Sequence, residues 1–235
     1  MKDVVRANFD ESPSAYEAYE ARTGRFAALA DRLVAAMAPH GRVLDAGAGT
    51  GAAADALAAH AEEVVALDLS VEMLRVNPTP ARVVGDFDHL PLCDASVDAV
   101  AFTASLFLVP DPSAAVAEAQ RVLRPGGVVG AVALDGWTAD GEDVFASVDR
   151  QSRSPASADA VVDAVDAAFE TTTGTWSFAS SGEDLRAFHA IPALAARLYP
   201  GLPTDERVAR ATDALAHVEG DLEQHWRWVV GRRGA

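Results

Sequence analysis

The chain has 235 residues, of which 50% are hydrophobic, a fraction that suits a packed core and excludes a disordered or collagen-like chain. Its 35 acidic and 19 basic residues give a formal net charge of -16, which repels phosphate backbones and anionic lipids, so we expect neither nucleic acid nor membrane as a partner. The sequence shows no apolar stretch long enough for a membrane helix and no signal peptide at its start, and Cys93 is its only cysteine. We therefore expect a cytoplasmic protein.

The first 135 residues alternate between helical and strand-like patterns. Apolar residues three and four apart predict an amphipathic helix over residues 14–37, which Gly24 divides in two. Further helices are expected over residues 52–60, after a cap at Ser70, and from Pro112 to Leu123 after a cap at Asp111. Short apolar runs that end at a charge or a glycine predict five strands: Arg42–Ala46, Glu63–Leu67, Ala81–Gly85, Val97–Thr103 and Val128–Leu134.

The pattern changes beyond Asp135. Residues 136–154 read as loop, 156–169 as helix and 171–179 as strand. Two helical stretches follow over residues 181–198 and 204–218, with breaks at Pro192 and at residues 200–203. Residues 222–231 alternate in the manner of a strand, and we expect this strand to lie at an edge of the sheet.

Strands that alternate with helices, each strand almost continuously apolar, indicate a parallel sheet with helices on both faces. The fold class is therefore α/β, with a doubly wound, mostly parallel sheet of about seven strands. We expect residues 1–235 to form a single domain, because no linker or repeat divides them. Within it, residues 1–40 form leader helices, 41–135 a ligand-binding half, and 136–235 a substrate-side region with a helical insertion before the last strand.

A glycine-rich turn follows the first predicted strand. Gly47, Gly49 and Gly51 let the backbone turn tightly and approach a ligand, and the next helix offers its free N–H groups. Gly47, Gly49 and Ala52 also satisfy the dinucleotide pattern G-x-G-x-x-G/A, and Asp68 lies at the distance expected for an acid that binds a ribose. A nicotinamide dinucleotide is thus one candidate ligand.

Two acidic positions favour a different ligand. Asp45 stands directly before the glycines, where a carboxylate is unfavourable for a pyrophosphate but suits an ammonium group. A second acidic turn, Gly85-Asp86-Phe87, follows the third strand. This arrangement resembles the class I S-adenosylmethionine-dependent methyltransferases, which have a Rossmann-like fold. The resemblance spans Phe9 to Leu134 through six segments in the family's order: Asp45–Gly51, Asp68–Leu74, Gly85-Asp86 with Leu90-Pro91, Ser96–Asp98, Val109–Pro112 and Arg121–Gly127.

The resemblance implies a cofactor, S-adenosyl-L-methionine, and a role for each matching residue. The glycine turn would line the methionine moiety, and Asp45 would hold its amino group. Asp68 would accept both ribose hydroxyls, and Leu69 and Met73 would enclose the adenine. Asp86 would bind the exocyclic amino group. The predicted cofactor residues are Tyr16, Asp45, Ala46, Gly47, Ala48, Gly49, Gly51, Asp68, Leu69, Met73, Gly85, Asp86, Phe87 and Thr103.

Other interpretations of single residues stay open. Asp86 can be a plain loop acid, and Tyr16 and Tyr19, which match a leader helix that covers the cofactor in relatives, can equally be core contacts. Cys93 has no motif around it and is expected to be inert. Where many relatives carry histidine after the fourth strand, this chain has Leu106-Phe107-Leu108, so that wall of the site should be apolar.

The sequence therefore predicts a methyltransferase that acts on a small molecule by in-line transfer to an O, N or C nucleophile. We expect the acceptor to be hydrophobic or aromatic and to bind between the leader helices and residues 136–218. No metal is expected, and no residue is assigned as a catalytic base. The alternatives are a non-catalytic S-adenosylmethionine-binding protein and an NAD-dependent oxidoreductase. A Tyr-x-x-x-Lys dehydrogenase is excluded because Lys2 is the only lysine.

The composition also suggests an environment. An acidic chain that has arginine in place of almost all its lysine is similar to proteins of halophilic archaea. The carboxylate-rich surfaces of those proteins keep them soluble in molar salt. An acidic protein from a GC-rich genome would have the same composition, so both origins remain open.

Overall fold

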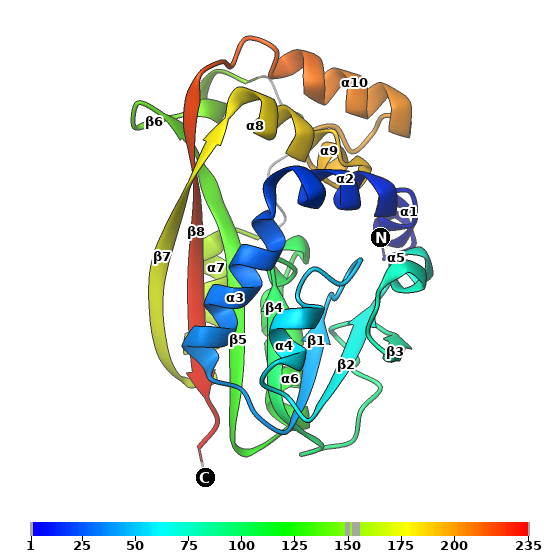
Figure 1. Cartoon of the computed structure of the whole chain (residues 1–235), viewed down its shortest axis with the longest axis vertical. Helices are drawn as coiled ribbons and strands as arrows, with labels where there is room; N and C mark the ends of the chain where they lie inside the picture. The colour runs from blue at the N-terminus through cyan, green and yellow to red at the C-terminus, as the bar shows by residue number, and fades with distance from the viewer. Residues whose placement is uncertain (1, 149–150, 152–155, 235) are drawn as a thin grey trace.

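The computed structural model describes residues 2–148, 151 and 156–234. They form one mixed sheet with helices on both faces (Figure 1). The strand order is β3 (Ala81–Val84), β2 (Glu63–Asp68), β1 (Arg42–Ala46), β4 (Val97–Thr103), β5 (Leu123–Ala139), β8 (Asp221–Arg232) and β7 (Glu170–Ser181), and the short β6 (Glu142–Asp143) pairs with β5. The predicted doubly wound α/β sheet is confirmed.

Strand direction divides this sheet into two parts. The pairs from β3 through β2, β1 and β4 to β5 are all parallel. By contrast, β8 runs antiparallel to both β5 and β7. The chain leaves β1 toward β2 and β3 on one side and returns to β4 and β5 on the other, so the strand order reverses between β1 and β4. In open α/β sheets a ligand binds at the carboxyl ends of the strands beside such a reversal.

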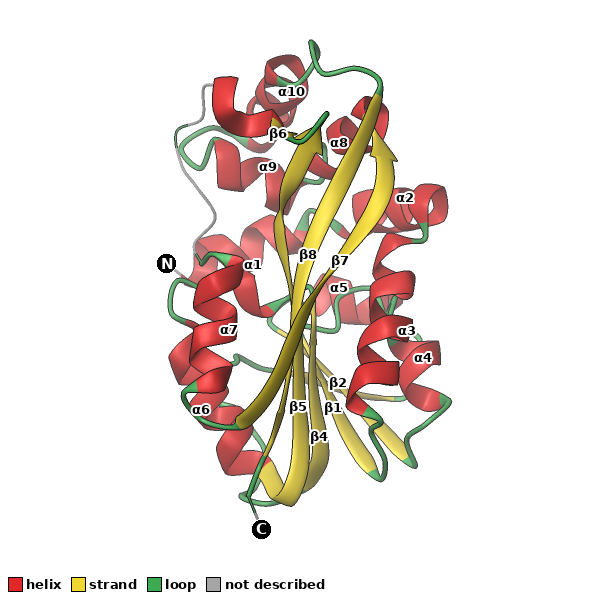
Figure 2. Ribbon diagram, turned by 90° about the vertical axis from the view of Figure 1, so that its left-hand side faces the viewer, coloured by secondary structure: helices red, strands yellow, loops and turns green. Residues whose placement is uncertain are grey.

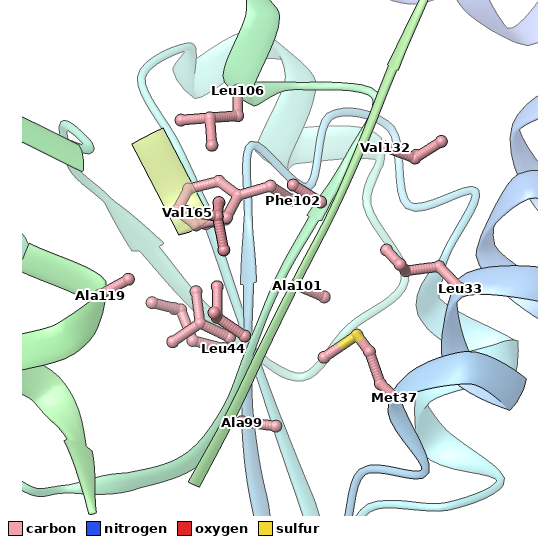
Figure 3. Close-up of a cluster of buried hydrophobic side chains, with 14 of the residues drawn as sticks. Leu33, Met37, Leu44, Ala99, Ala101, Phe102, Leu106, Ala119, Val132 and Val165 are labelled. Carbon is pink, nitrogen blue, oxygen red and sulfur yellow. The ribbon is translucent and has the colours of Figure 1, made fainter. Parts of the chain in front are cut away.

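Two pairs of helices cover opposite faces of the sheet. Figure 2 shows α3 (Arg25–Met37) and α4 (Ala54–Ala58) on one face and α6 (Pro112–Val122) and α7 (Ala158–Asp166) on the other. The hydrophobic core lies on both sides of the central strands. In Figure 3, Leu33 and Met37 of α3 and Ala119 and Val165 of the opposite helices point toward β1, β4 and β5.

The remaining helices gather beyond the carboxyl ends of the strands. The leader helices α1 (Lys2–Asp10) and α2 (Pro13–Thr23) lie there with α5 (Val71–Val76), near α8 (Gly182–His189), α9 (Pro192–Leu198) and α10 (Thr204–Ala214) (Figure 1). The last three helices connect β7 to β8, which confirms the predicted insertion before the last strand. Single-turn 3-10 helices occur at Leu106–Leu108 and Val144–Ser147.

Local signals in the sequence fix several boundaries as predicted. Gly24 adopts a left-handed conformation, φ 56°, that ends α2 and starts α3. The Ser70 hydroxyl accepts a hydrogen bond from the Met73 backbone N–H at the start of α5, and the Asp111 carboxylate does the same for Ser113 before α6. The predicted bounds of β1 and β4 agree with the structure.

Other boundaries differ from the prediction. The helix expected over residues 52–60 is only α4. The predicted break at Pro192, by contrast, is confirmed, because α8 ends before it and α9 begins there. The fifth strand is longer than expected, because its far end pairs with β8 as far as Thr138. Part of the loop predicted for 136–154 lies outside the described residues.

The prediction that the last strand lies at an edge is wrong. β8 lies between β5 and β7, and the edge strand is β7. The burial of the two strands gives the reason: Trp226 and Val229 in β8 are completely buried, whereas the Thr171–Thr173 run of β7 is polar and largely exposed. In the part of the chain that the structure describes, no helix has the length and apolar character needed to cross a membrane.

Candidate functional site

A cavity of about 400 Å³ lies at the carboxyl ends of β1, β2 and β4, beside the reversal of strand order. This volume is within the range of small-molecule and cofactor sites. Its lining combines the glycine turn, the ends of β2 and β4, the loop after β3 and residues of the leader helices. The lining residues are Val5, Phe9, Tyr16, Phe26, Asp45, Gly47, Ala48, Gly49, Thr50, Ala52, Ala53, Asp68, Leu69, Met73, Gly85, Asp86, Phe87, Asp88, Thr103, Ala104, Ser105, Leu108, Val109, Pro110, Asp111 and Ala114.

The glycine turn forms the floor of the cavity. The backbone N–H groups of Gly47 and Ala48 both donate to the Leu67 carbonyl, at 2.7 and 3.0 Å, which holds the turn against β2. Gly47 has φ +79°, and a Cβ there would collide with Ser105 and lie 2.8 Å from Phe87 Cζ. Gly49 has φ +53°, and a Cβ there would meet nothing within 4 Å. The turn is therefore packed at Gly47 and open toward the cavity at Gly49.

Asp45 brings a carboxylate to this floor from the end of β1. Its side chain is 1% exposed, and its Oδ2 atom has no hydrogen-bond partner. Burial raises the pKa of Asp45 to about 7, and the Asp68 carboxylate adds to the rise. A buried carboxylate without a donor is costly, so the site lacks a cationic or donor group at this position. The ammonium group of a ligand would supply both charge and donors.

Asp68 is held in a fixed orientation at the end of β2. Its Oδ2 accepts the Gly49 N–H at 2.9 Å, and its Oδ1 accepts the Ser70 N–H at 2.8 Å. Burial raises the pKa of Asp68, and these backbone hydrogen bonds oppose the rise. Each carboxylate oxygen has a further lone pair, so Asp68 can accept hydrogen bonds from two neighbouring hydroxyl groups of a ligand.

The loop after β3 forms an apolar wall with one acidic corner. Phe87 packs edge-on against Phe102 of β4, with ring centroids 5.6 Å apart. Leu69 and Met73 also line the cavity, so these side chains give a flat ligand ring an apolar surface on which to pack. The Asp86 carboxylate accepts the Asp88 N–H at 3.2 Å, which orients it within the turn.

The leader helices cover the opening of the cavity. The Tyr16 ring lies 6.3 Å from Phe9 and 5.6 Å from Phe26, centroid to centroid. The Ser70 hydroxyl donates to the Asp10 carboxylate at 2.6 Å, which ties α1 to α5. The leader helices and the strand ends thus enclose one site.

The structure brings together most of the predicted cofactor residues. Ala46 and Gly51 are the exceptions, because neither lines the cavity. Ala46 is completely buried, and its carbonyl accepts a hydrogen bond from Ser105 Oγ at 2.6 Å. Gly51 is needed for packing instead: a Cβ there would collide with Pro78 and lie 3.1 Å from Asn77 Cγ.

Tyr19 also lies away from the lining. Its ring packs 5.3 Å from Phe188 of α8, within an apolar cluster that includes Trp137 and Leu185. Burial raises the pKa of Tyr19 to about 12. The interpretation of Tyr19 as a core contact is therefore the one that agrees with its position.

Sequence reasoning missed several lining residues. Val5 and Phe9 are four residues apart on α1, a spacing that places them on one face of a helix. That spacing was available in the sequence, but nine residues give little periodicity. Ala104 and Ser105 follow β4 and carried no signal of their own, whereas Val109 belongs to a segment of the family resemblance to which no site role was assigned. No described residue after Ala114 lines the cavity, so the described part of residues 136–218 does not form the acceptor wall that we expected there.

Comparison with known proteins identifies the domain that carries this site. A family profile described as a methyltransferase domain matches residues 44–131, which include the glycine turn and β1, β2 and β4. Residues 44–131 are thus similar to a methyltransferase domain. The match covers the glycine turn, so it favours the methyltransferase interpretation over the dinucleotide one.

Individual relatives extend this finding. A demethylmenaquinone methyltransferase of Renibacterium salmoninarum is 38% identical over 134 residues, which are 53% of this chain and 56% of that protein. A malonyl-[acyl-carrier protein] O-methyltransferase of Dechloromonas aromatica is 39% identical over 138 residues, which are 57% of this chain and 51% of that protein. The chain thus spans about half the length of the curated relatives it matches.

The likeness in three dimensions extends further along the chain than the likeness in sequence. The YcgJ protein of Bacillus subtilis superposes with a TM-score of 0.63 at 18% identity, over 90% of this chain and 99% of that one. The fold that this chain shares with that protein therefore continues through the second half, beyond the residues that the family profile matches.

Proposed function

We propose that this protein is an S-adenosylmethionine-dependent methyltransferase whose acceptor is a small molecule. The observation that carries the proposal is the unpartnered, buried Asp45 carboxylate beside the open Gly49 position, in a cavity of about 400 Å³ within a methyltransferase domain. A cationic amino acid moiety fits that position by charge and by hydrogen bonding.

The residues on the cavity wall fit the other parts of the cofactor. Asp68 presents an oriented carboxylate to the two ribose hydroxyls, and Leu69, Met73 and Phe87 provide apolar surface for the adenine ring. Asp86 would accept the adenine amino group. In this proposal Thr103, at the end of β4, faces the reacting centre.

When bound, S-adenosylmethionine supplies an electrophilic methyl group on a positively charged sulfur. The protein's task is then to hold a nucleophile in line with that methyl group, because the departing thioether needs no proton. The leader helices α1 and α2 exclude water from the cavity through Val5, Phe9 and Tyr16. Asp45 and Asp68 place negative charge where a cationic ligand is most favourable.

The relatives do not share one acceptor. The names of the two relatives give two different acceptors, demethylmenaquinone and malonyl-[acyl-carrier protein]. Leu108, Val109 and Pro110 make the acceptor side of the cavity apolar, which supports the proposal of a hydrophobic or aromatic acceptor.

Calorimetry with S-adenosylhomocysteine and with NAD tests the cofactor assignment. We expect S-adenosylhomocysteine to bind and NAD not to bind. Asp68→Asn should weaken S-adenosylhomocysteine binding about 100-fold, since two hydrogen bonds to a charged group contribute roughly 3 kcal/mol or more. Asp31→Asn, an exposed position on α3, is the matched control and should bind as the parent does. NAD binding, or equal affinity of Asp68→Asn and the parent, would contradict the proposal.

Turnover separates an enzyme from a protein that only binds the cofactor. A panel of small aromatic acceptors, assayed for formation of S-adenosylhomocysteine, should contain a substrate.

We also propose that the protein is cytoplasmic and adapted to high salt, and the net charge of -16 and the single lysine support this proposal. If so, the free energy of unfolding should rise between 0.1 and 2 M KCl.

A further inference from the structure

Arg197 of α9 is a cation for which the proposed cofactor site has no use. It is half-buried, and its guanidinium lies 4.7 Å above the centre of the Phe107 ring. Its Nη2 approaches the Phe107 carbonyl oxygen at 3.5 Å, a distance at the limit of a hydrogen bond. None of the described carboxylates forms an ion pair with it.

Arg197 lies next to the apolar end of the cavity. Phe107 adjoins Leu108, which lines the cavity, and Arg197 interacts electrostatically with Tyr16, another lining residue. The N-terminus of α9 is fixed to the leader helices because the Ala193 N–H donates to Ser12 Oγ at 3.0 Å. Arg197 follows Ala193 by one helical turn, so it lies on the same face of α9.

The charge of Arg197 is not balanced by its surroundings. Burial lowers the pKa of Arg197 to about 10, and Tyr16 only partly opposes the shift. Burial also raises the pKa of Tyr16, so its hydroxyl stays protonated and supplies no negative charge. The lining itself carries the opposite charge, since its acidic residues are the five aspartates Asp45, Asp68, Asp86, Asp88 and Asp111 and it contains no basic residue among those described.

This separation of charge suggests two kinds of ligand in one cavity. Asp45 and Asp68 lie at the strand ends that suit a cationic cofactor, whereas Asp111 follows the apolar run over residues 108–110. Arg197 is not itself a lining residue; it lies over Phe107, next to the Leu108 wall, where an anion that reached it would gain a charge-assisted hydrogen bond. A partly buried guanidinium with one ring and one distant carbonyl as partners still has N–H donors to offer.

We propose that Arg197 determines acceptor specificity, and that the acceptor is an apolar or aromatic small molecule whose carboxylate pairs with this guanidinium. The inference rests on the proposed methyltransferase function. It adds the chemical class of the acceptor and names α9 as the element through which the second half of the chain acts on the site.

The test compares a carboxylate with its uncharged amide. Calorimetry measures the binding of 4-hydroxybenzoate and of 4-hydroxybenzamide to protein saturated with S-adenosylhomocysteine, at one fixed KCl concentration. We expect the carboxylate to bind at least tenfold more tightly than the amide. Arg197→Gln should remove this preference, and Arg197→Lys should keep part of it.

Two controls make the outcome decisive. Arg210→Gln removes the same charge from an exposed position on the neighbouring helix α10 and should leave the preference unchanged. All variants should bind S-adenosylhomocysteine as the parent does, which shows that the cofactor site is intact. Equal binding of the two probes to the parent, no binding of either, or an unchanged preference in Arg197→Gln would overturn the inference. Failure of the parent to bind S-adenosylhomocysteine would instead overturn the proposed function.

Discussion

The two halves of this chain relate to the cavity in different ways. From residue 42 to residue 114 the lining follows the loops at the ends of β1, β2, β3 and β4, whereas none of the described residues after 136 lines the cavity. The second half completes the sheet with β7 and β8 and supports the leader helices with α8, α9 and α10. Residues that lie close together in the sequence of the first half thus line most of the cavity. The second half supports the site through contacts between residues that are far apart in sequence.

The largest predicted difference between the halves is the loss of stability when a glycine is replaced by alanine. Gly47→Ala places a Cβ against Ser105 and Phe87 in a left-handed backbone conformation, so the free energy of unfolding should fall by about 3 kcal/mol. Urea denaturation measures this change. Gly136→Ala in β5, where a Cβ meets nothing within 4 Å, should be close to neutral, and similar losses in both variants would contradict this account of the turn.

A second substitution in the same turn should act on binding more than on folding. Gly49→Ala adds a Cβ in open space on the cavity floor, with φ +53°, so the left-handed conformation costs about 1 kcal/mol. The methyl group occupies volume that we assign to the ligand, and affinity for S-adenosylhomocysteine should fall more than tenfold. Calorimetry and thermal melting on the same sample distinguish the two effects. An affinity equal to that of the parent would show that the ligand does not lie over Gly49.

The unpartnered Asp45 should make both stability and binding depend on pH. Burial raises its pKa from 3.8 to about 7, so between these values the folded protein binds more protons than the unfolded chain. Stability of the free protein should therefore fall as pH rises from about 4 to 7. Binding of a ligand ammonium requires the ionised carboxylate, so affinity should fall by up to about tenfold per pH unit below 7.

Asp45→Asn provides the control for this pH dependence. The variant should bind S-adenosylhomocysteine weakly, with a flatter pH profile between pH 5 and 7. Any slope that remains is expected from Asp68, whose pKa burial also raises. Stability that increases with pH over this window in the parent would contradict the assigned environment of Asp45.

The smallest predicted difference is between the effects of removing two helix caps, one in each half of the chain. Ser70 caps α5 and also donates to Asp10 of α1, whereas Ser157 caps α7, away from the cavity lining. Each Ser→Ala substitution should lower the free energy of unfolding by about 1 kcal/mol. Only Ser70→Ala should also weaken S-adenosylhomocysteine binding by a few fold, because α1 carries Val5 and Phe9 over the cavity. Equal binding by both variants would show that the tie to α1 does not matter.

The same division explains what the sequence could predict. β1 and β4 were predicted to the residue because each is a compact apolar run, and each lies between parallel neighbours. The glycine turn, Asp45 and Asp68 were predicted to lie together because each belongs to a short motif at the end of a strand, and the structure places them in one cavity. These features depend on residues within a few positions of each other.

The failures depend on partners far away in sequence. The place of β8 depends on β5 and β7, which lie about 90 and 50 residues earlier in the chain, and the alternating Trp226 and Trp228 predict a strand without showing its neighbours. The far end of β5 is a strand because it pairs with β8 and, at its last two residues, with β6. Likewise, nothing in the sequence around Arg197 shows that it meets Phe107 and Tyr16.

The place of β8 between β5 and β7 has a consequence for synthesis of the chain. β5 and β7 cannot be joined until residues 221–232 have left the ribosome, so a nascent chain that has reached α10 exposes two unpaired strand edges. During that interval the parallel part from β3 to β5 can already fold, and the site-bearing loops with it. The long antiparallel pairing of β8 then closes the sheet last, and a ribosome that stalls within α10 would release an intermediate prone to aggregation.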